Sequence, residues 1–489
     1  MSNGSNLKKS VISGVLWKFI EVLTTDGISF VVSVVLARLL SPDDYGEIAL
    51  VNVFIVIANV FVVNGLGTAL IQKKEADSLD FSSVFYFNFA FSLTLYGIIF
   101  LTAPALARFY ETPRLVIVLR VLALRVPLAS INSVQNAYVS RQMAFKKVFW
   151  ASLVGTVLSG AVGIAMALAG YGVWALVGQV LFGALINTIV MFVVISWRPT
   201  LEFSWQRLKS LVDYGWKILA SSLIKAGYEQ LSSLIIGKLY TTENLAHYTK
   251  GKHYPELVVS GVNSSISSVL FPAFSKKQTD LNELKQMVRR SMHMGTYVLM
   301  PLLFGLAALA KPFISFLLTD KWLPCAIFLQ ISCIYYAFQP VQTANLQAIR
   351  AIGRSDVILI LDIIKRGVGL LFLLAFMHQG VLAVAIAPLV VSFVAMIANA
   401  IPNRKFIKYR FCEQLSDLLP NLFLSLLMAI AVYFLSQLLH QLGMSSFFVL
   451  LISFFAGVVI YILESLLTRN KSFFYIIRTI KEYLPGNRK

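Results

Sequence analysis

Residues 358–376 read ILILDIIKRGVGLLFLLAF, an apolar run long enough to cross a lipid bilayer as a helix. Asp362, Lys365 and Arg366 interrupt this run. Insertion scales assign a charged side chain at the centre of a membrane helix a cost of about 2.5–3.5 kcal/mol. If the run is a membrane helix, its charges therefore require either partners or a function.

The composition of the whole chain is that of a membrane protein. Hydrophobic residues make up 58% of its 489 residues and charged residues 13%, and the mean hydropathy is +0.76. Soluble domains contain about 45–50% apolar and about 25% charged residues. A core surrounded by water cannot bury this excess, so the surrounding solvent must be lipid.

Apolar runs of the length of a membrane helix recur along the chain. They predict an all-α membrane protein with about fourteen transmembrane helices. No stretch alternates in the manner of an outer-membrane strand. The predicted spans are residues 11–36, 46–71, 81–107, 115–139, 148–170, 173–197, 211–237, 253–274, 287–310, 325–349, 356–377, 381–400, 419–439 and 446–467.

Basic residues are concentrated in alternate loops, which predicts the orientation. If the N-terminus is cytoplasmic, the inside segments are rich in Lys and Arg and the outside segments are poor in them. This asymmetry follows the positive-inside rule and predicts a multi-pass protein of the cytoplasmic (inner) membrane with both termini cytoplasmic. It also accounts for the net charge of +19 without nucleic acid as a partner. Examples on the predicted inside are Lys8, Lys9, Lys73, Arg141, Lys276, Lys277, Arg404 and Lys405.

A weak internal repeat predicts the domain organisation. LKKSVISGVLWK (7–18) resembles LKSLVDYGWK (208–217), and ARLLSPDDYG (37–46) aligns with GKLYTTENLA (237–246). Parallel repeats occur in secondary transporters, whose substrate sites lie where the repeats meet. Chance similarity between hydrophobic helices is the alternative. The repeat predicts two six-helix lobes, 1–200 and 201–402, followed by a terminal helix pair and cytoplasmic tail at 403–489.

Motifs for several enzyme classes are absent from the sequence. There is no G-x-x-x-x-G-K-[ST] phosphate loop, no H-E-x-x-H and no G-x-S-x-G. Cys325, Cys333 and Cys412 do not show the spacing of a metal site. The segments outside the membrane are short. These observations favour a transporter and predict no enzymatic activity, cofactor or bound metal.

Charged residues at membrane depth are the candidate functional residues. Several lie one helical turn apart and should pair on one helix face, such as Lys18 with Glu21 and Lys225 with Glu229. The bases outnumber the acids, which suits an anionic substrate because Arg and Lys form charge-assisted hydrogen bonds with phosphate oxygens. The alternative is purely structural pairing. The bases are Lys18, Arg120, Arg125, Lys217, Lys225, Lys365 and Arg366, and the acids are Glu21, Asp26, Glu229 and Asp362.

A cationic cavity is therefore predicted. Asp362 would hold Lys365 and Arg366 in place and neutralise part of their charge. The two basic side chains would line the cavity and bind an anionic head group. Amide side chains at membrane depth would contact sugars or, alternatively, other helices. The predicted cations are Arg120, Arg125, Lys225, Lys365 and Arg366; the supporting or coupling acids are Glu21, Asp26, Glu229 and Asp362; the polar candidates are Gln135, Asn136 and Asn263.

Three stretches resemble a known family. They are LKKSVISGVLWKFIEVLTTDGISFVVSVVLARLLSPDDYGEIALV (7–51), VNSSISSVLFPAFSKKQTD (262–280) and PLLFGLAALAKPFISFLLTDKWLPC (301–325). The sequence is similar to bacterial polysaccharide exporters of the colanic-acid-exporter type, which are oligosaccharide flippases of the multidrug/oligosaccharidyl-lipid/polysaccharide superfamily. The resemblance implies two six-helix lobes plus a terminal pair, with a central cationic cavity that opens alternately to each side of the membrane.

The implied activity is movement of undecaprenyl-pyrophosphate-linked oligosaccharide to the outer leaflet, within a membrane-lipid environment. An ion gradient, of H⁺ or Na⁺, or consumption of the product outside would supply the energy. A polysaccharide polymerase and a co-exporter are possible partners. Two alternatives remain: a drug/cation antiporter of the same superfamily, which would rely on buried acids, and a membrane glycan polymerase or glycosyltransferase. The latter would need an acidic pair in an outside loop, where only Asp43, Asp44 and Glu111 come close.

Overall fold

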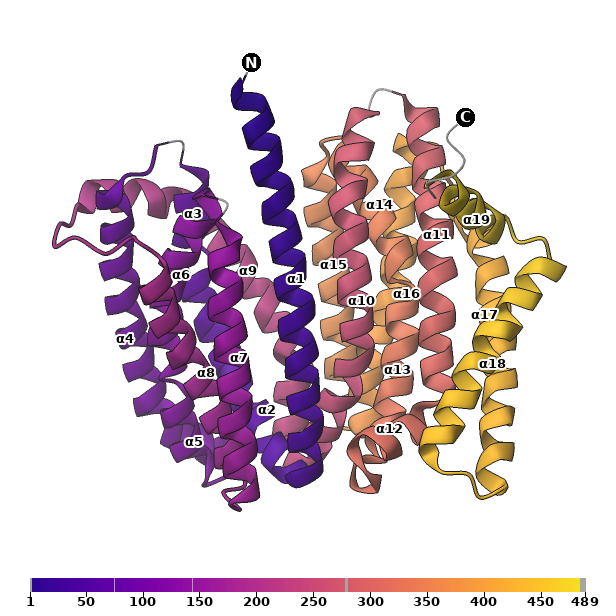
Figure 1. The fold of residues 1–489 in the computed structure, drawn as a ribbon, viewed down its shortest axis with the longest axis horizontal. Helices are drawn as coiled ribbons and strands as arrows, with labels where there is room; N and C mark the ends of the chain where they lie inside the picture. Colours follow the sequence, from indigo (N-terminus) through magenta and orange to yellow (C-terminus); the bar gives the residue numbers. More distant parts are fainter. Residues whose placement is uncertain (1, 74, 143, 278–279, 484–489) are drawn as a thin grey trace. The chain divides into compact units, whose positions relative to one another are not determined.

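The structure is a computed structural model that describes residues 2–73, 75–142, 144–277 and 280–483. Helices make up 87% of it, and the described residues contain no strand, which confirms the all-α prediction. The chain forms two compact units, Met1–Ala246 and His247–Lys489 (Figure 1). The division into 1–200, 201–402 and 403–489 stays a prediction, and the end of the predicted tail, 484–489, lies outside the described residues.

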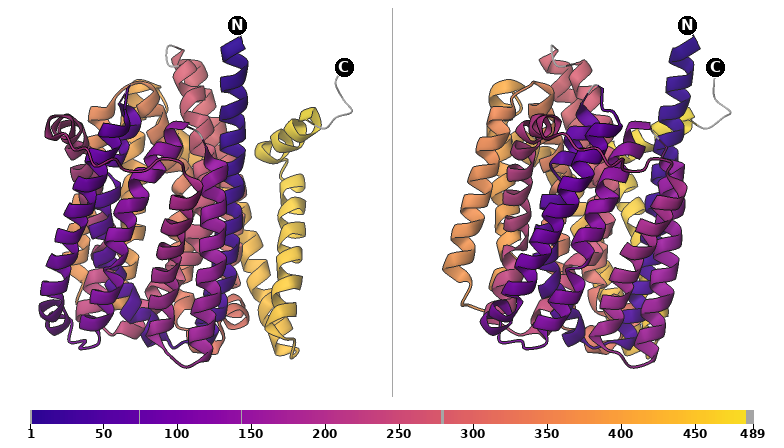
Figure 2. Two further views of the ribbon diagram at one scale, coloured as in Figure 1. Left: turned by 60° about the vertical axis from the view of Figure 1, so that its left-hand side comes forward. Right: turned by 90° about the vertical axis from the view of Figure 1, so that its left-hand side faces the viewer.

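Unit 1 is a bundle of long helices that run up and down beside one another (Figures 1 and 2). Short helices α3 and α5 lie next to the longer helices α2 and α6 in the chain. The elements are α1 (Ser2–Leu39), α2 (Pro42–Val63), α3 (Leu66–Gln72), α4 (Ser78–Phe109), α5 (Leu115–Leu122), α6 (Arg125–Gln142), α7 (Phe145–Leu168), α8 (Val173–Val194), α9 (Trp205–Leu239) and the first residues of α10 (Thr242–Lys276).

Unit 2 contains the rest of α10 and a second set of antiparallel helices. Helices α17 and α18 form a hairpin, and α19 follows as a short helix at an angle to α18 (Figures 1 and 2). The elements are α11 (Leu281–Ala308), α12 (Ala310–Leu318), a 3-10 turn η1 (Asp320–Trp322), α13 (Cys325–Ala337), α14 (Gln339–Ala351), α15 (Ser355–Phe376), α16 (Val381–Phe406), α17 (Phe411–Gln441), α18 (Ser446–Leu467) and α19 (Lys471–Tyr483).

Among the described residues, 10 helical segments are long and apolar enough to cross a membrane. Four other predicted spans are also helical but do not qualify. Charged and polar side chains lower the apolarity of α9 and α15, and the span predicted at 325–349 breaks between α13 and α14, next to Pro340. Part of the span predicted in α10 consists of residues whose side chains the structure does not describe. The number fourteen therefore stays a prediction. The qualifying segments are Ile20–Leu39, Pro42–Gln72, Ser78–Phe109, Leu115–Gln142, Lys146–Leu168, Val173–Val194, Leu281–Ala308, Val381–Phe406, Phe411–Gln441 and Ser446–Leu467.

The start of α2 shows how local sequence sets a helix boundary. The hydroxyl of Ser41 accepts a hydrogen bond from the N–H of Asp44 (3.2 Å), and the Asp44 carboxylate accepts one from the N–H of Ser41 (3.1 Å). This reciprocal cap satisfies N–H groups that have no partner within the helix. At the start of α10, Thr241 likewise accepts from the N–H of Asn244 (3.2 Å). The aligned segments 37–46 and 237–246 thus start helices in a similar way, and the repeat itself stays a prediction.

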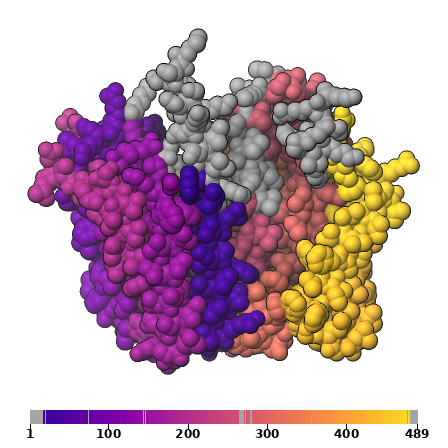
Figure 3. Space-filling model, viewed as in Figure 1, coloured from indigo at the N-terminus to yellow at the C-terminus, as the bar shows by residue number. Residues whose placement is uncertain are grey.

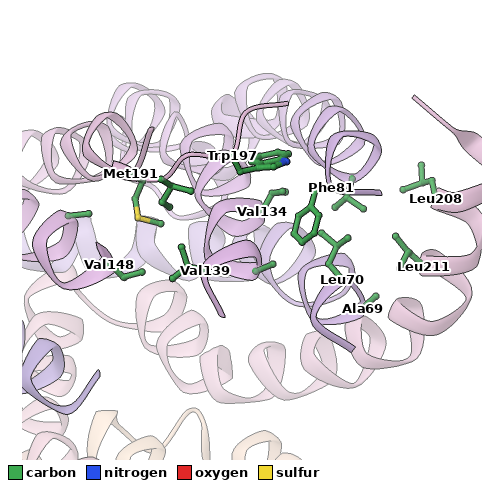
Figure 4. Packing of buried hydrophobic residues seen from close by; sticks show 14 residues of the cluster. Ala69, Leu70, Phe81, Val134, Val139, Val148, Met191, Trp197, Leu208 and Leu211 are labelled. Carbon is green, nitrogen blue, oxygen red and sulfur yellow. The ribbon is translucent and has the colours of Figure 1, made fainter. Parts of the chain in front are cut away.

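A hydrophobic core in unit 1 joins α3, α4, α6, α7, α8 and α9. Figure 4 shows Phe81 and Trp197 beside Val134, and the two ring centroids lie 5.8 Å apart. Met191 of α8 belongs to the same cluster. This core fixes α6 and α8 relative to each other, and these two helices carry polar residues of the cavity described below.

The outer faces of α17 and α18 expose large apolar side chains. Figure 3 shows these helices in yellow at the surface of unit 2. Phe423, Phe434 and Phe455 are more than half exposed, at 62%, 65% and 59%. An apolar surface of this kind fits lipid rather than water as its surroundings. The structure therefore agrees with the membrane environment predicted from composition.

A buried carboxylate holds the connection between α3 and α4. The side chain of Asp80 is fully buried, and its two oxygens accept hydrogen bonds from Lys73 Nζ at 2.6 and 2.7 Å. Arg207 Nη1 of α9 lies 3.6 Å from the second oxygen. Because breaking a buried pair leaves an uncompensated charge, Asp80→Asn should lower the free energy of unfolding by about 2–3 kcal/mol.

The measurement is the thermal unfolding midpoint of the purified protein in detergent. Glu75→Gln is the control, because Glu75 is an exposed acid in the same connection. An unchanged midpoint for Asp80→Asn would contradict the assigned role of this carboxylate.

Candidate functional site

Unit 1 contains a polar cavity of about 820 Å³. Small-molecule sites in proteins measure roughly 300–1,000 Å³, so a cavity of this size accommodates a sizeable ligand. Its walls come from α1, α6, α7 and α8 together with the end of α2 and α3. Most of these segments are otherwise apolar, so the polar side chains of the cavity wall stand out from the rest of their helices.

Each wall presents a row of polar residues at helical spacing. Residues three or four positions apart lie on one face of a helix, so each row faces the cavity as a unit. Helix α1 contributes Thr25, Asp26 and Ser29; α6 contributes Asn132, Asn136 and Ser140; α7 contributes Ser152, Thr156 and Ser159; α8 contributes Gln179 and Asn187 on either side of Gly183.

Two amide oxygens in the wall lack protein partners. The Oδ1 atoms of Asn132 and Asn187 are buried and accept no hydrogen bond from any described residue. The amide of Asn132 is fixed at its other end, because its Nδ2 donates to Thr188 Oγ1 at 2.9 Å. A buried acceptor without a partner is costly, by about 1–3 kcal/mol. Both oxygens are closed off from the open space of the cavity in this conformation, so a ligand would reach them only after the side chains move.

Arg125 and Asp26 both line this cavity. Arg125 is half-buried at the start of α6, and Asp26 is exposed on α1. Among the residues that the structure describes, neither forms an ion pair, with the other or with a third residue. A half-buried guanidinium without a counter-ion at membrane depth favours an anionic ligand.

Glu21 lies beside the cavity and not in its wall. One carboxylate oxygen accepts from Ser152 Oγ of the cavity wall at 3.1 Å, and the other accepts from Lys18 Nζ at 3.0 Å. The predicted pairing of Lys18 with Glu21 is therefore present. Glu21 positions Ser152 and partly neutralises Lys18.

The remaining predicted site residues of unit 1 do not line this cavity. Arg120 packs over the ring of Phe100, with 4.0 Å from Cζ to the ring centroid, and donates from Nε to the Phe100 carbonyl at 3.1 Å. Lys225 and Glu229 form the predicted pair on α9, at 3.9 Å. Gln135 is fully buried and outside the wall, and its side-chain oxygen and nitrogen have no described partner.

The charges of the stretch 358–376 lie in unit 2, on α15. Lys365 Nζ and Asp362 Oδ1 form an ion pair at 2.7 Å, which is the predicted local pairing, and Arg366 follows on the same helix. Asn263 of α10 accepts a hydrogen bond from Thr343 Oγ1 at 2.7 Å. The ion pair shows how Asp362 and Lys365 are held, and the role of the three charges in substrate binding stays a prediction.

Several wall residues were absent from the predicted site. They include Asn64, Gln179 and Asn187. Gln179, Gly183 and Asn187 are spaced four residues apart in a helix that is otherwise apolar. That spacing was a usable signal, because amides on one face of a membrane helix face protein or a cavity and not lipid.

Comparison with known proteins decides the family. A family described as "Polysaccharide biosynthesis protein" matches residues 35–327, more than half of the chain. The chain belongs to this family. The predicted resemblance to polysaccharide exporters is thereby confirmed at the level of the family.

Curated relatives of this chain are named for the biosynthesis of polysaccharides, and one of them is named as a transport protein. The chain is 27% identical to the succinoglycan biosynthesis transport protein ExoT of Rhizobium meliloti over 314 residues, which span 64% of each chain. It is 23% identical to the lipopolysaccharide biosynthesis protein WzxC of Escherichia coli over 404 residues, 81% of this chain and 80% of WzxC. The alignment with ExoT thus covers less than two thirds of that relative.

Solved structures show the fold of this chain. The lipid II flippase MurJ in an inward closed conformation superposes with a TM-score of 0.72 at 16% identity, covering 93% of this chain and 99% of MurJ. An inward-facing multidrug resistance MATE family transporter of the MOP superfamily gives 0.61 at 17% identity, covering 79% and 94%. The chain is a multi-pass membrane protein with the fold of these transporters.

Proposed function

We propose that this protein moves undecaprenyl-pyrophosphate-linked oligosaccharide repeat units from the cytoplasmic to the outer leaflet of the bacterial cytoplasmic membrane. It does so by alternating access, without catalysing a reaction. The polar cavity of unit 1 receives the head group, and the lipid tail stays in the bilayer. Both termini are cytoplasmic, in line with the distribution of Lys and Arg.

The observation that carries this proposal is the unpaired Arg125 in a wall of amides and hydroxyls. Arg125 suits a pyrophosphate oxygen, because guanidinium groups form charge-assisted hydrogen bonds with phosphate. The amide and hydroxyl side chains that line the cavity, such as Asn136, Ser140 and Gln179, suit sugar hydroxyls. A head group that carries both chemistries matches the wall better than an apolar cation does.

The family of this chain and the names of a relative and of a structural neighbour support a polysaccharide precursor as cargo. ExoT is named as a transport protein of succinoglycan biosynthesis, and MurJ as a lipid II flippase. Asp26, in the same cavity, is the candidate for coupling to H⁺ or Na⁺. A polymerase and a co-exporter would consume the units outside.

The test is to deplete the protein in cells and measure the lipid-linked glycan pool by mass spectrometry with a sidedness probe. We expect completed units to accumulate on the cytoplasmic leaflet, because synthesis continues while transfer stops. The same spectra would identify the glycan. Complementation with the wild-type gene is the control and should restore the pool.

Two results would contradict the proposal. An unchanged pool, in a strain that also lacks any second flippase, would exclude this cargo and favour the drug/cation antiporter. Accumulation of units on the outer leaflet would place the protein after transfer, as expected of a glycan polymerase.

A further inference from the structure

A second cavity, of about 740 Å³, lies in unit 2 at the end where α11 and α17 begin and α18 gives way to α19. Its wall carries a cluster of basic residues: Arg289 and Arg290 from α11, and Arg469 and Lys471 from the connection into α19. Among the described residues that line the cavity, one carries a carboxylate, Asp417 of α17. The cavity is therefore basic, and the proposed transport function does not use it.

Asp417 neutralises only part of this cluster. Arg289 Nη2 binds Asp417 Oδ1 at 2.5 Å, and the Tyr409 hydroxyl donates to Oδ2 at 2.8 Å. Arg290, Arg469 and Lys471 are exposed, and none forms an ion pair with a described residue. These three positive charges converge on one cavity, so the site is prepared for an anion.

The connection between α18 and α19 is built to hold its basic residues in place. Asn470 is buried; its Nδ2 donates to Asn421 Oδ1 at 3.0 Å, and its Oδ1 accepts from the N–H of Ser472 at 2.9 Å. Arg469, directly before it, has a φ of 48°, in the left-handed region. Glycine is the usual residue there after a helix. An arginine at this position, at a conformational cost of about 1–2 kcal/mol, points to a role for its charge.

The surroundings of the cavity fit a lipid better than a soluble anion. Pro420 and Phe423 of α17 belong to its wall, and Phe423 is also part of the exposed apolar face of that helix. On α19, Phe474 and Tyr475 are exposed next to Lys471, as in helices that lie at a membrane interface. Basic pockets between membrane helices bind lipid head groups.

We propose that this cavity binds the phosphate of an anionic membrane phospholipid. Arg290, Arg469 and Lys471 contact the phosphate oxygens, while the acyl chains lie along the apolar face of α17 around Phe423. This site is separate from the proposed cargo cavity of unit 1. Its test uses lipid retention and not transport, so it can fail or succeed independently of the proposed function.

The experiment uses the full-length protein reconstituted in vesicles of phosphatidylcholine and phosphatidylglycerol. After mild extraction, native mass spectrometry counts the phosphatidylglycerol that stays bound. We expect the triple variant Arg290→Gln/Arg469→Gln/Lys471→Gln to retain it at least about tenfold less than wild type, because each base near a phosphate contributes to binding. The control Arg404→Gln/Lys405→Gln/Arg410→Gln removes the same charge from exposed residues outside the cavity and should retain the lipid.

A second variant separates binding from folding. Arg469→Gly relieves the left-handed backbone, so it should leave the unfolding temperature unchanged or higher while it weakens lipid retention. Equal retention by the triple variant and its control would overturn the proposal. Displacement of phosphatidylglycerol by millimolar inorganic phosphate would also overturn it, by identifying a soluble-anion site.

Discussion

Arg125→Gln is expected to lower the rate of lipid-linked glycan transfer by about 100-fold. The side chain lines the unit 1 cavity without an ion-pair partner among the described residues. Glutamine keeps most of its length and a hydrogen-bond donor but removes the charge. If Arg125 binds a phosphate oxygen, the loss of a desolvated charge pair should dominate the effect on the rate.

The measurement is transfer of the glycan across the membrane in cells that contain each variant at the wild-type level. Arg120→Gln is the matched control, since it removes the same charge in the same predicted span. Arg120 contacts Phe100 and does not line the cavity, so its variant should transport almost normally. Equal loss in both variants, or no loss in either, would contradict the assigned role of Arg125.

The local features of the fold were predictable from sequence. The spacing of Lys18 and Glu21, and of Asp362 and Lys365, predicted the ion pairs that the structure contains. Such pairs depend only on positions within one helix. The all-helical fold was predictable for the same reason, because length and apolarity are properties of each segment alone.

The site was predictable only in part, because the position of a residue along a membrane helix does not tell which way its side chain points. Arg120 and Arg125 belong to the same predicted span, yet only Arg125 lines the cavity. Five residues of helix turn a side chain by roughly 140°, and the break between α5 and α6 changes the direction further. The amide candidates from sequence came from the helices that correspond to α6 and α10, whereas the cavity wall also includes the amides Gln179 and Asn187 of α8.

The second large effect is expected at Gly46, where α2 meets the start of α10 at Thr242. A Cβ atom added to Gly46 would lie 2.0 Å from the Thr242 carbonyl oxygen and 2.4 Å from its carbon. Both are backbone atoms, so no side-chain rotation can relieve the clash. Thr242 is also tied to α2 by a hydrogen bond from its Oγ1 to Asp43 Oδ1 at 3.1 Å. Gly46→Ala should therefore lower the free energy of unfolding by at least about 3 kcal/mol.

The sign of this effect separates packing from helix propensity. In an exposed helix the same change stabilises by about 0.8–1.0 kcal/mol. Gly227 of α9 is the control, because an added Cβ would have no atom within 4 Å. The unfolding midpoint should fall for Gly46→Ala and stay level or rise for Gly227→Ala. If both midpoints rise, helix propensity alone governs Gly46, and the close approach of α2 to Thr242 is wrong.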